Sequence, residues 1–203
     1  MNARLRIVAP VATRPVAPDP RIDALRARDR RTIEEVLGEL LPKVRRWLHH
    51  LLGPRDDLDD AVQDALSEIA SALPRYEGRA SLATLARRIT VRVAYRYFGK
   101  RRVGEVSLSL VPPPPESLDP ESRILGREAL LRLYRCLERL PRKRRMAFVL
   151  CAVEGMSPTE AAEIEGVSPL AMRSRLMHAR NEVARRLASD PYVAALLRRG
   201  TTS

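Results

Sequence analysis

The sequence predicts an all-α protein made of two small helical domains. Apolar residues recur at steps of three and four along most of its 203 residues, which is the spacing of amphipathic helices. Leu, Ala, Arg and Glu are abundant, and this composition favours helix over strand. The four consecutive prolines at 112–115 interrupt the pattern, because proline breaks a helix interior. We therefore expect a three-helix bundle and a four-helix domain joined by a proline-rich linker.

The first domain is expected over residues 31–103. Residues 1–30 are rich in proline and arginine and lack apolar periodicity, so they predict a flexible basic extension. Apolar stripes at helical spacing then cover residues 33–51, 58–73 and 82–97. Gly53-Pro54 separates the first two stripes, and Ser81 is a suitable N-cap for the third helix. Three amphipathic helices with short connections predict one bundle.

The second domain is expected over residues 123–189, between a linker at 104–122 and a C-terminal tail at 190–203. The linker contains the four prolines, which favour an extended polyproline conformation that acts as a stiff spacer. Helical apolar patterns resume at Arg123 and continue through four segments.

The last two of these helices predict a helix-turn-helix. Ser157 and Glu160 have the spacing of a capping box, with proline at the first helical position. Gly166 supplies the left-handed backbone that a tight turn requires, and Ser168 caps the helix that follows. That last helix carries basic and short side chains near its start, as a recognition helix in the major groove does.

Arg173 of this motif can donate to guanine edges or only to phosphates, while the remaining arginines suit phosphate contact or a solvated face. A generic helical hairpin is the alternative to a DNA-reading motif. The residues predicted to contact DNA are Ser157, Thr159, Ser168, Leu170, Ala171, Arg173, Ser174, Arg175, Met177, His178 and Arg180.

The second predicted helix opens with a cluster of acids, Asp56, Asp57, Asp59 and Asp60, followed by Gln63. Carboxylates near a helix N-terminus are stabilised by the helix dipole, which accounts for one or two of them. Four acids in so basic a chain indicate in addition a surface for a basic protein partner.

The third predicted helix is basic and follows a loop with the sequence PRYEGRAS. Its arginines lie one turn apart, so they predict a ridge that binds phosphates, with a solvated surface as the alternative. The tyrosine and arginines of the loop suggest capture of unstacked bases. The candidate residues of this region are Arg75, Tyr76, Glu77, Gly78, Arg79, Arg88, Arg92, Arg96 and Lys100.

Composition limits the other possibilities. The net charge of +12 favours a polyanionic partner, although a genome rich in G and C also produces many arginines. Cys136 and Cys151 are expected to be buried free thiols, and neither they nor the three histidines predict a metal site. The residues suggest neither a catalytic group nor a cofactor. We expect a cytoplasmic protein that is not an enzyme and is not inserted in a membrane.

Taken together, these motifs resemble the extracytoplasmic-function (ECF) group of bacterial sigma factors. DLDDAVQDAL is similar to the family's acidic box, with its residues at Asp57, Asp59, Asp60 and Gln63. The segment from LERLP to MHAR resembles the family's fourth conserved region, which contains a helix-turn-helix. The chain departs from the family pattern at Leu85-Ala86, at Arg92 and Arg96, and at Leu170-Ala171-Met172.

This resemblance implies a sigma region 2-like domain at 31–103 and a region 4-like domain at 123–189. It implies that the acidic box binds the clamp helices of the polymerase β′ subunit, with further contacts to the β subunit. The loop at 75–81 and the third helix would hold the −10 promoter element, and the helix-turn-helix would hold the −35 element. Family members are commonly silenced by an anti-sigma factor, so one is implied as a partner.

Two other functions remain compatible with the sequence. The chain can be a stand-alone helix-turn-helix regulator, with an effector or dimerisation domain at residues 33–103. It can also be a decayed sigma factor that binds polymerase or an anti-sigma factor without opening promoters.

Overall fold

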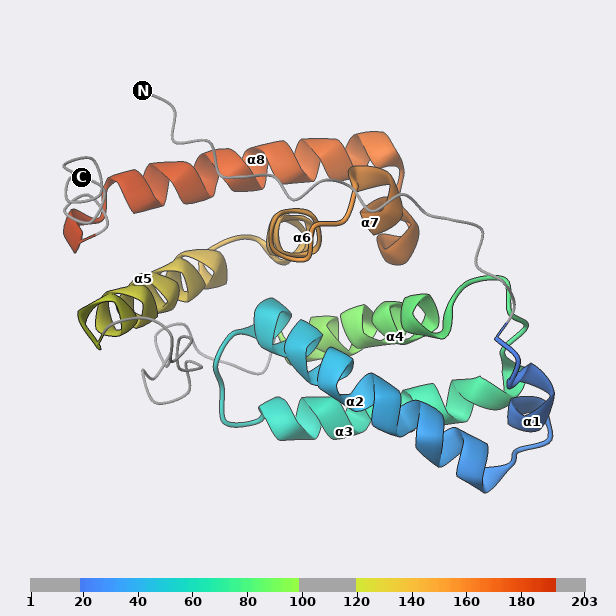
Figure 1. Cartoon of the computed structure of the whole chain (residues 1–203). Helices are drawn as coiled ribbons and strands as arrows, with labels where there is room; N and C mark the ends of the chain where they lie inside the picture. The colour runs from blue at the N-terminus through green and yellow to red at the C-terminus, as the bar shows by residue number, and fades with distance from the viewer. Residues whose placement is uncertain (1–18, 99–119, 193–203) are drawn as a thin grey trace.

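The computed structural model describes residues 19–98 and 120–192, with side chains of the second part described from Ile124 onward. Helices and their connections account for this part of the chain, and it contains no strand. Two helical units lie against each other, one formed by α1 to α4 and the other by α5 to α8 (Figure 1). The predicted all-α class with two helical domains is therefore confirmed. Within the described ranges, no helix combines the length and apolar character needed to cross a bilayer.

Three helices form the body of the first unit, α2 (Arg30–Leu52), α3 (Leu58–Ala72) and α4 (Leu82–Tyr97). Each helix packs against the other two, and their apolar stripes meet in one core. The side chain of Asp29 accepts from the Thr32 amide at the start of α2, and Ser81 caps α4 through the Thr84 amide. A short turn, η1 (Leu73–Arg75), connects α3 to the loop before α4.

Residues 19–30 differ from the expected flexible extension. They contain the short helix α1 (Ile22–Arg26), and Leu25 is completely buried against the first unit. Arg21 anchors the segment through ion pairs with Asp19 and Glu39 of α2. A single buried leucine and one ion-pair network order this segment, and neither produces a periodic pattern in the sequence. Residues 1–18 of the expected extension lie outside the described residues.

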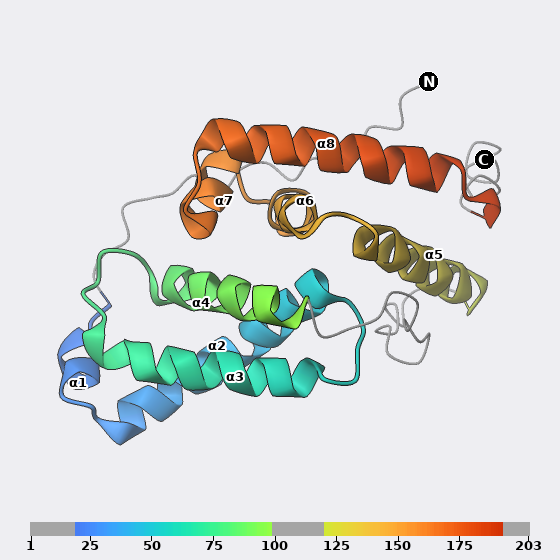
Figure 2. The ribbon, with the colours of Figure 1, turned by 180° about the vertical axis from the view of Figure 1, so that it is seen from behind.

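The second unit contains α5 (Pro120–Glu138), α6 (Arg142–Phe148), α7 (Pro158–Glu165) and α8 (Pro169–Ala188). A π-helical turn, η3 (Val149–Val153), continues α6, and α6 packs against α8 (Figure 2). Because α5 begins at Pro120, the last residues of the expected linker already belong to a helix; residues 99–119 lie outside the described residues. Cys136 and Cys151 are buried free thiols, as the sequence predicts, and burial raises the pKa of both.

The two units are in direct contact. Helix α4 packs against α7, and α2 packs against η3. The hydroxyl of Tyr95 on α4 donates to Glu165 of α7 at 2.7 Å, and the guanidinium of Arg145 lies 5.2 Å from the ring centroid of Phe98. The sequence predicts two domains and a spacer but not this contact.

Candidate protein and nucleic-acid interfaces

The acidic start of α3 divides into paired and exposed residues. Asp57 is half-buried and forms an ion pair with Arg55, whose side chain is only 4% exposed. Asp59 is exposed and lies 2.6 Å from Arg45 of α2. Asp56, Asp60 and Gln63 are exposed, and no ion pair within the described residues engages either aspartate. Three of the five predicted residues, Asp56, Asp60 and Gln63, are therefore exposed and engaged in no ion pair within the described residues.

Arg55 keeps the carboxylate of Asp57 in a fixed, half-buried position. Its guanidinium also donates to the Tyr97 carbonyl at 3.1 Å and lies 5.5 Å from the Tyr97 ring centroid. Tyr97 in turn donates its hydroxyl to Asp64 at 2.9 Å, and burial together with this carboxylate raises the pKa of Tyr97 to about 12. These contacts join the start of α3 to the end of α4.

The loop before α4 does not present its tyrosine to solvent. Tyr76 is 7% exposed and donates its hydroxyl to the Ala80 carbonyl at 2.5 Å, which closes the loop on itself. Gly78 turns the chain with φ of 77°, and Glu77 and Arg79 form an exposed ion pair of 2.8 Å. The prediction of a tyrosine available for base stacking is therefore wrong in this conformation, because the ring is part of the core. Arg75 remains exposed beside it.

The basic ridge of α4 is partly neutralised. Glu68 of α3 lies between two of its arginines, 3.1 Å from Arg92 and 2.6 Å from Arg96. Arg88 is exposed, and no ion pair within the described residues engages it. Lys100 lies outside the described residues. The sequence of α4 alone does not predict this neutralisation, because the acid comes from a neighbouring helix.

The helix-turn-helix forms as its caps predict. The Glu160 amide donates to the Ser157 hydroxyl at 3.2 Å, and the Glu160 carboxylate accepts from the Ser157 amide at 2.8 Å. Gly166 adopts φ 66° and ψ 38°, the left-handed turn between α7 and α8, and Ser168 accepts from the Ala171 amide. Ser157 and Ser168, both predicted to contact DNA, therefore have a structural role as helix caps.

Most of the side chains predicted to contact DNA are exposed on the outer face of the helix-turn-helix. Ala171 is half-buried, and Arg175 turns toward Glu165, with 3.4 Å between the guanidinium and the carboxylate. Arg175 therefore belongs to the contact between helices rather than to the outer face. The exposed members of the predicted set are Thr159, Ser168, Leu170, Arg173, Ser174, Met177, His178 and Arg180.

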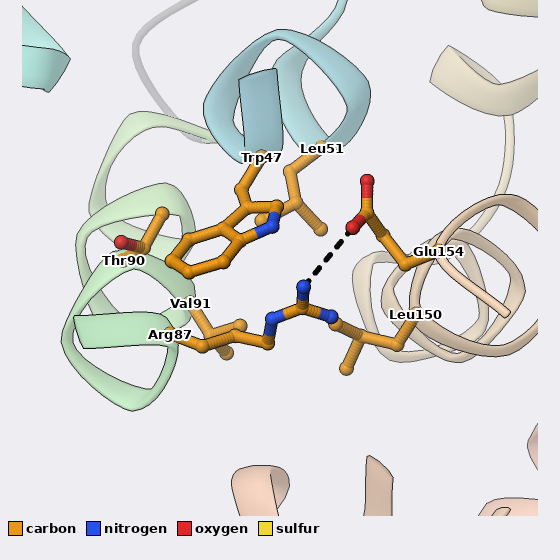
Figure 3. Close-up of a pocket in the computed structure, with 7 residues that line it drawn as sticks. All are labelled: Trp47, Leu51, Arg87, Thr90, Val91, Leu150 and Glu154. Carbon is orange, nitrogen blue, oxygen red and sulfur yellow. Dashed lines mark hydrogen bonds and ion pairs between the residues drawn. The ribbon is translucent and has the colours of Figure 1, made fainter. Parts of the chain in front are cut away.

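A buried carboxylate joins the two units, which we call the Glu154 cluster. The Glu154 side chain is 6% exposed and lies 3.1 Å from Arg87 (Figure 3). It also lies 2.5 Å from His50 Nδ1 and 3.9 Å from Arg46. The Arg87 guanidinium also lies 4.3 Å from the centroid of the Trp47 ring. One carboxylate of the second unit thus faces three cationic or titratable groups of the first.

Burial alone raises the pKa of the Glu154 carboxyl, but the hydrogen bond with His50 and the charges of Arg87 and Arg46 lower it below its ordinary value. Burial of Arg87 lowers the pKa of its guanidinium, and Glu154 opposes that effect. Beside this cluster, the Tyr134 hydroxyl lies 3.0 Å from His49 Nδ1. Both adjacent histidines of α2 therefore contact the second unit.

The sequence contains one indirect signal for this cluster. Glu154 occupies the C-cap position of η3, where the partial charge of a helix end disfavours a carboxylate. An acid in such a position needs compensating cations. The identity of those cations, which lie more than sixty residues away, is set only by the packing of the two units.

Comparisons with known proteins assign a family description to each unit. Residues 37–103 match the sigma-70 region 2 family, and residues 130–183 match the sigma-70 region 4 family. The chain is 30% identical over 167 residues to the ECF RNA polymerase sigma-E factor of Escherichia coli K12, covering 72% of this chain and 78% of that protein.

Two solved structures have a similar fold. One is CnrH in complex with the cytosolic domain of CnrY, with a TM-score of 0.62 and 22% identity over 83% of this chain and 96% of that chain. The other is the sigma factor RpoE in complex with the anti-sigma factor NepR from Bartonella quintana. Its TM-score is 0.60, with 25% identity over 77% of this chain and 97% of that chain.

Proposed function

This chain belongs to the extracytoplasmic-function group of the sigma-70 family, whose members direct transcription initiation, and we propose how its residues divide that task. The acidic start of α3 binds core RNA polymerase, and α8 binds the −35 promoter element. The observation that supports this division is the order of features. The region 2 match contains the exposed acids, and the region 4 match contains the helix-turn-helix.

Core polymerase binds through Asp56, Asp60 and Gln63, with Asp59 exchanging Arg45 for a basic group of the β′ clamp helices. This assignment is supported by exposure, because these side chains lie in or just before the first turns of α3 and are exposed to solvent. Asp57 contributes by fixing the backbone there through its ion pair with Arg55. Acidic side chains at an interface raise the association rate with a basic partner more than they raise final affinity.

Promoter DNA binds through both units. Arg173 and Arg180 on α8 approach the −35 element, and the N-terminus of that helix faces a phosphate. In the first unit, Arg88 and Arg75 are exposed for phosphate contact near the −10 element, and Arg92 and Arg96 join them when DNA competes with Glu68. Polymerase supplies the catalysis, so this chain needs no catalytic group of its own.

An anti-sigma factor is proposed as a further partner, because the solved structure of RpoE is a complex with one, NepR. Since core polymerase and promoter DNA are found in the bacterial cytoplasm, we propose that location for this chain.

Run-off transcription with core polymerase tests the function. Wild-type chain is expected to give promoter-specific transcripts, and Asp60→Ala is expected to reduce both polymerase capture and transcript yield several-fold. Glu163→Ala, an exposed acid of α7, is the matched control and is expected to leave both unchanged. Polymerase binding without transcripts from any genomic promoter would instead identify a decayed sigma factor. Unchanged polymerase binding by Asp60→Ala would contradict the proposed docking surface.

A further inference from the structure

Two large apolar side chains of α8 are unusually exposed. Leu170 is 73% exposed and Met177 is 52% exposed, whereas Met172 and Leu176 of the same helix are buried in the core. Exposed apolar area has a cost of roughly 25 cal/mol per Å² relative to burial, so such a pair suggests a surface that becomes covered. Neither side chain belongs to the stripe with which α8 packs on α6 and α7.

These two side chains share one face with polar residues. Leu170, Arg173, Ser174 and Met177 are separated by three, four and seven positions, so they lie along one side of two helical turns. All four are exposed, and no ion pair within the described residues engages Arg173. We call this set the α8 reading face. It combines an arginine and a hydroxyl with apolar side chains on either end.

The chemistry of this face matches the major groove of DNA. Guanine offers two acceptors there that suit an arginine, and thymine offers a C5-methyl group that suits an apolar side chain. The surroundings favour DNA over an apolar protein partner. Arg180 on α8, and Arg142 and Lys143 at the start of α6, are exposed cations of the same unit. A polyanion is attracted to these charges, whereas an apolar protein surface gains nothing from them.

We propose that Leu170 and Met177 read thymine methyl groups in the −35 element, one on each side of the base pair contacted by Arg173. This inference rests on the proposed function, because it assumes that α8 enters promoter DNA. Seven residues of helix span about 10.5 Å, and base pairs are spaced about 3.4 Å apart. The two thymines are therefore expected about three base steps from each other, with a guanine between them.

Replacement of thymine by deoxyuridine tests this directly, because it removes the methyl group and leaves base pairing intact. Single substitutions are made at each thymine of the upstream element and measured by run-off transcription with reconstituted holoenzyme. Two positions are expected to lose about fourfold in transcript yield, which corresponds to about 0.8 kcal/mol for one buried methyl group. Leu170→Ala is expected to abolish the loss at one position, and Met177→Ala at the other.

Ile124→Ala is the matched control, since Ile124 is 70% exposed on α5 and outside the helix-turn-helix. It is expected to leave both uridine effects intact. A holoenzyme that transcribes well but is insensitive to uridine at every position overturns the inference and leaves the proposed function standing. Leu170→Ala that lowers transcription equally on thymine and uridine templates also overturns it and indicates a protein partner. Absence of transcripts with wild-type chain overturns the proposed function itself.

Discussion

At the scale of single residues, Glu154 links the two units through its ion pairs and hydrogen bonds. Its carboxylate is almost completely buried and is compensated by His50, Arg87 and Arg46, all from the first unit. A buried carboxylate without such partners is strongly unfavourable, so these groups and the closed arrangement depend on each other. Substitutions at Glu154 therefore act on the contact between units and not only on local stability.

Glu154→Gln is expected to reduce the free energy of separating the two units by about 1–3 kcal/mol, because hydrogen bonds to charged groups become weaker neutral ones. The chain has a single tryptophan, Trp47, and it lies in this cluster. Its fluorescence in a urea titration measures the transition, which is expected at lower urea in the variant. Glu163→Gln is the matched control, because Glu163 is exposed. Equal midpoints for wild type and Glu154→Gln would contradict the assignment.

The difference in the free energy of unit separation between wild type and Glu154→Gln is expected to depend on pH with a definite sign. The pKa of Glu154 is lowered in the folded chain from its ordinary value of 4.5, so its contribution is fully present above that value. It is lost as the pH falls through the lower pKa of the folded state. The gap between wild type and Glu154→Gln should therefore be constant at neutral pH and shrink in acid. Glu165 is opposite, because burial raises its pKa, and Glu165→Gln should not reproduce this profile.

The acids of α3 separate into two roles that mutation can distinguish. Asp57→Asn leaves the buried Arg55 guanidinium without its counterion and is expected to reduce stability by about 1–3 kcal/mol. Asp60→Asn removes an exposed charge and is expected to change stability by less than about 0.5 kcal/mol while weakening polymerase binding. Thermal unfolding and polymerase affinity, measured on both variants, give the two readouts. A stability loss confined to Asp60→Asn would reverse the assignment.

Sequence patterns predicted residues whose environment is local and missed those whose environment comes from another helix. The caps at Ser81, Ser157 and Ser168 form as predicted, because each bonds to an amide three residues ahead. Glu68 and Glu154 were not predicted as partners of α4 arginines, because their positions depend on how helices pack. Amphipathic spacing indicates which face of a helix is buried but not which helix covers it.

At the scale of elements, the turn between α7 and α8 sets the direction of α8. Gly166 has φ of 66°, and a Cβ built on it meets no atom within 4 Å. Space is therefore not the constraint, and the left-handed backbone alone requires glycine. The capping box of α7 and the Ser168 cap of α8 fix the helices on either side.

Gly166→Ala is expected to destabilise the chain by about 1–2 kcal/mol, which is the cost of a left-handed conformation for a residue with a Cβ. Gly166→Asn is expected to lose less, since asparagine tolerates that conformation. Urea unfolding followed by circular dichroism measures both. An equal loss for the two substitutions would point to a steric cause, which the open space around Gly166 argues against.

At the scale of the whole molecule, the proposed function requires an arrangement other than the closed one, because both promoter elements are to be bound at once. Elements centred at −10 and −35 are 25 base pairs apart, which is about 85 Å along the duplex. Helix α4 has 16 residues and α8 has 20, so they are about 24 and 30 Å long. Because α4 contacts α7, and α7 packs on α8, the two proposed DNA-binding surfaces lie much closer than 85 Å. The proposed function therefore predicts that the units separate when a promoter is bound.

Trp47 can report this separation inside the holoenzyme. It is 3% exposed between α2, Arg87 and the second unit, so its surroundings change when the Glu154 cluster opens (Figure 3). Chain labelled with 5-fluorotryptophan carries one fluorine, because Trp47 is the only tryptophan, and unlabelled core polymerase adds no signal. We expect the fluorine resonance of the free chain to be replaced by a different one when polymerase and promoter DNA are added.

Glu154→Gln provides the internal comparison for this experiment. Because the variant weakens the Glu154 cluster, part of its free chain is expected to be open and to give the second fluorine resonance before polymerase is added. Glu163→Gln is expected to resemble wild type. The same weakening removes part of the free energy needed for opening, so Glu154→Gln is expected to bind polymerase and promoter more tightly than wild type. An unchanged fluorine resonance in the complete complex would mean that the units stay closed. That result would contradict the proposal that both units bind promoter DNA at the same time.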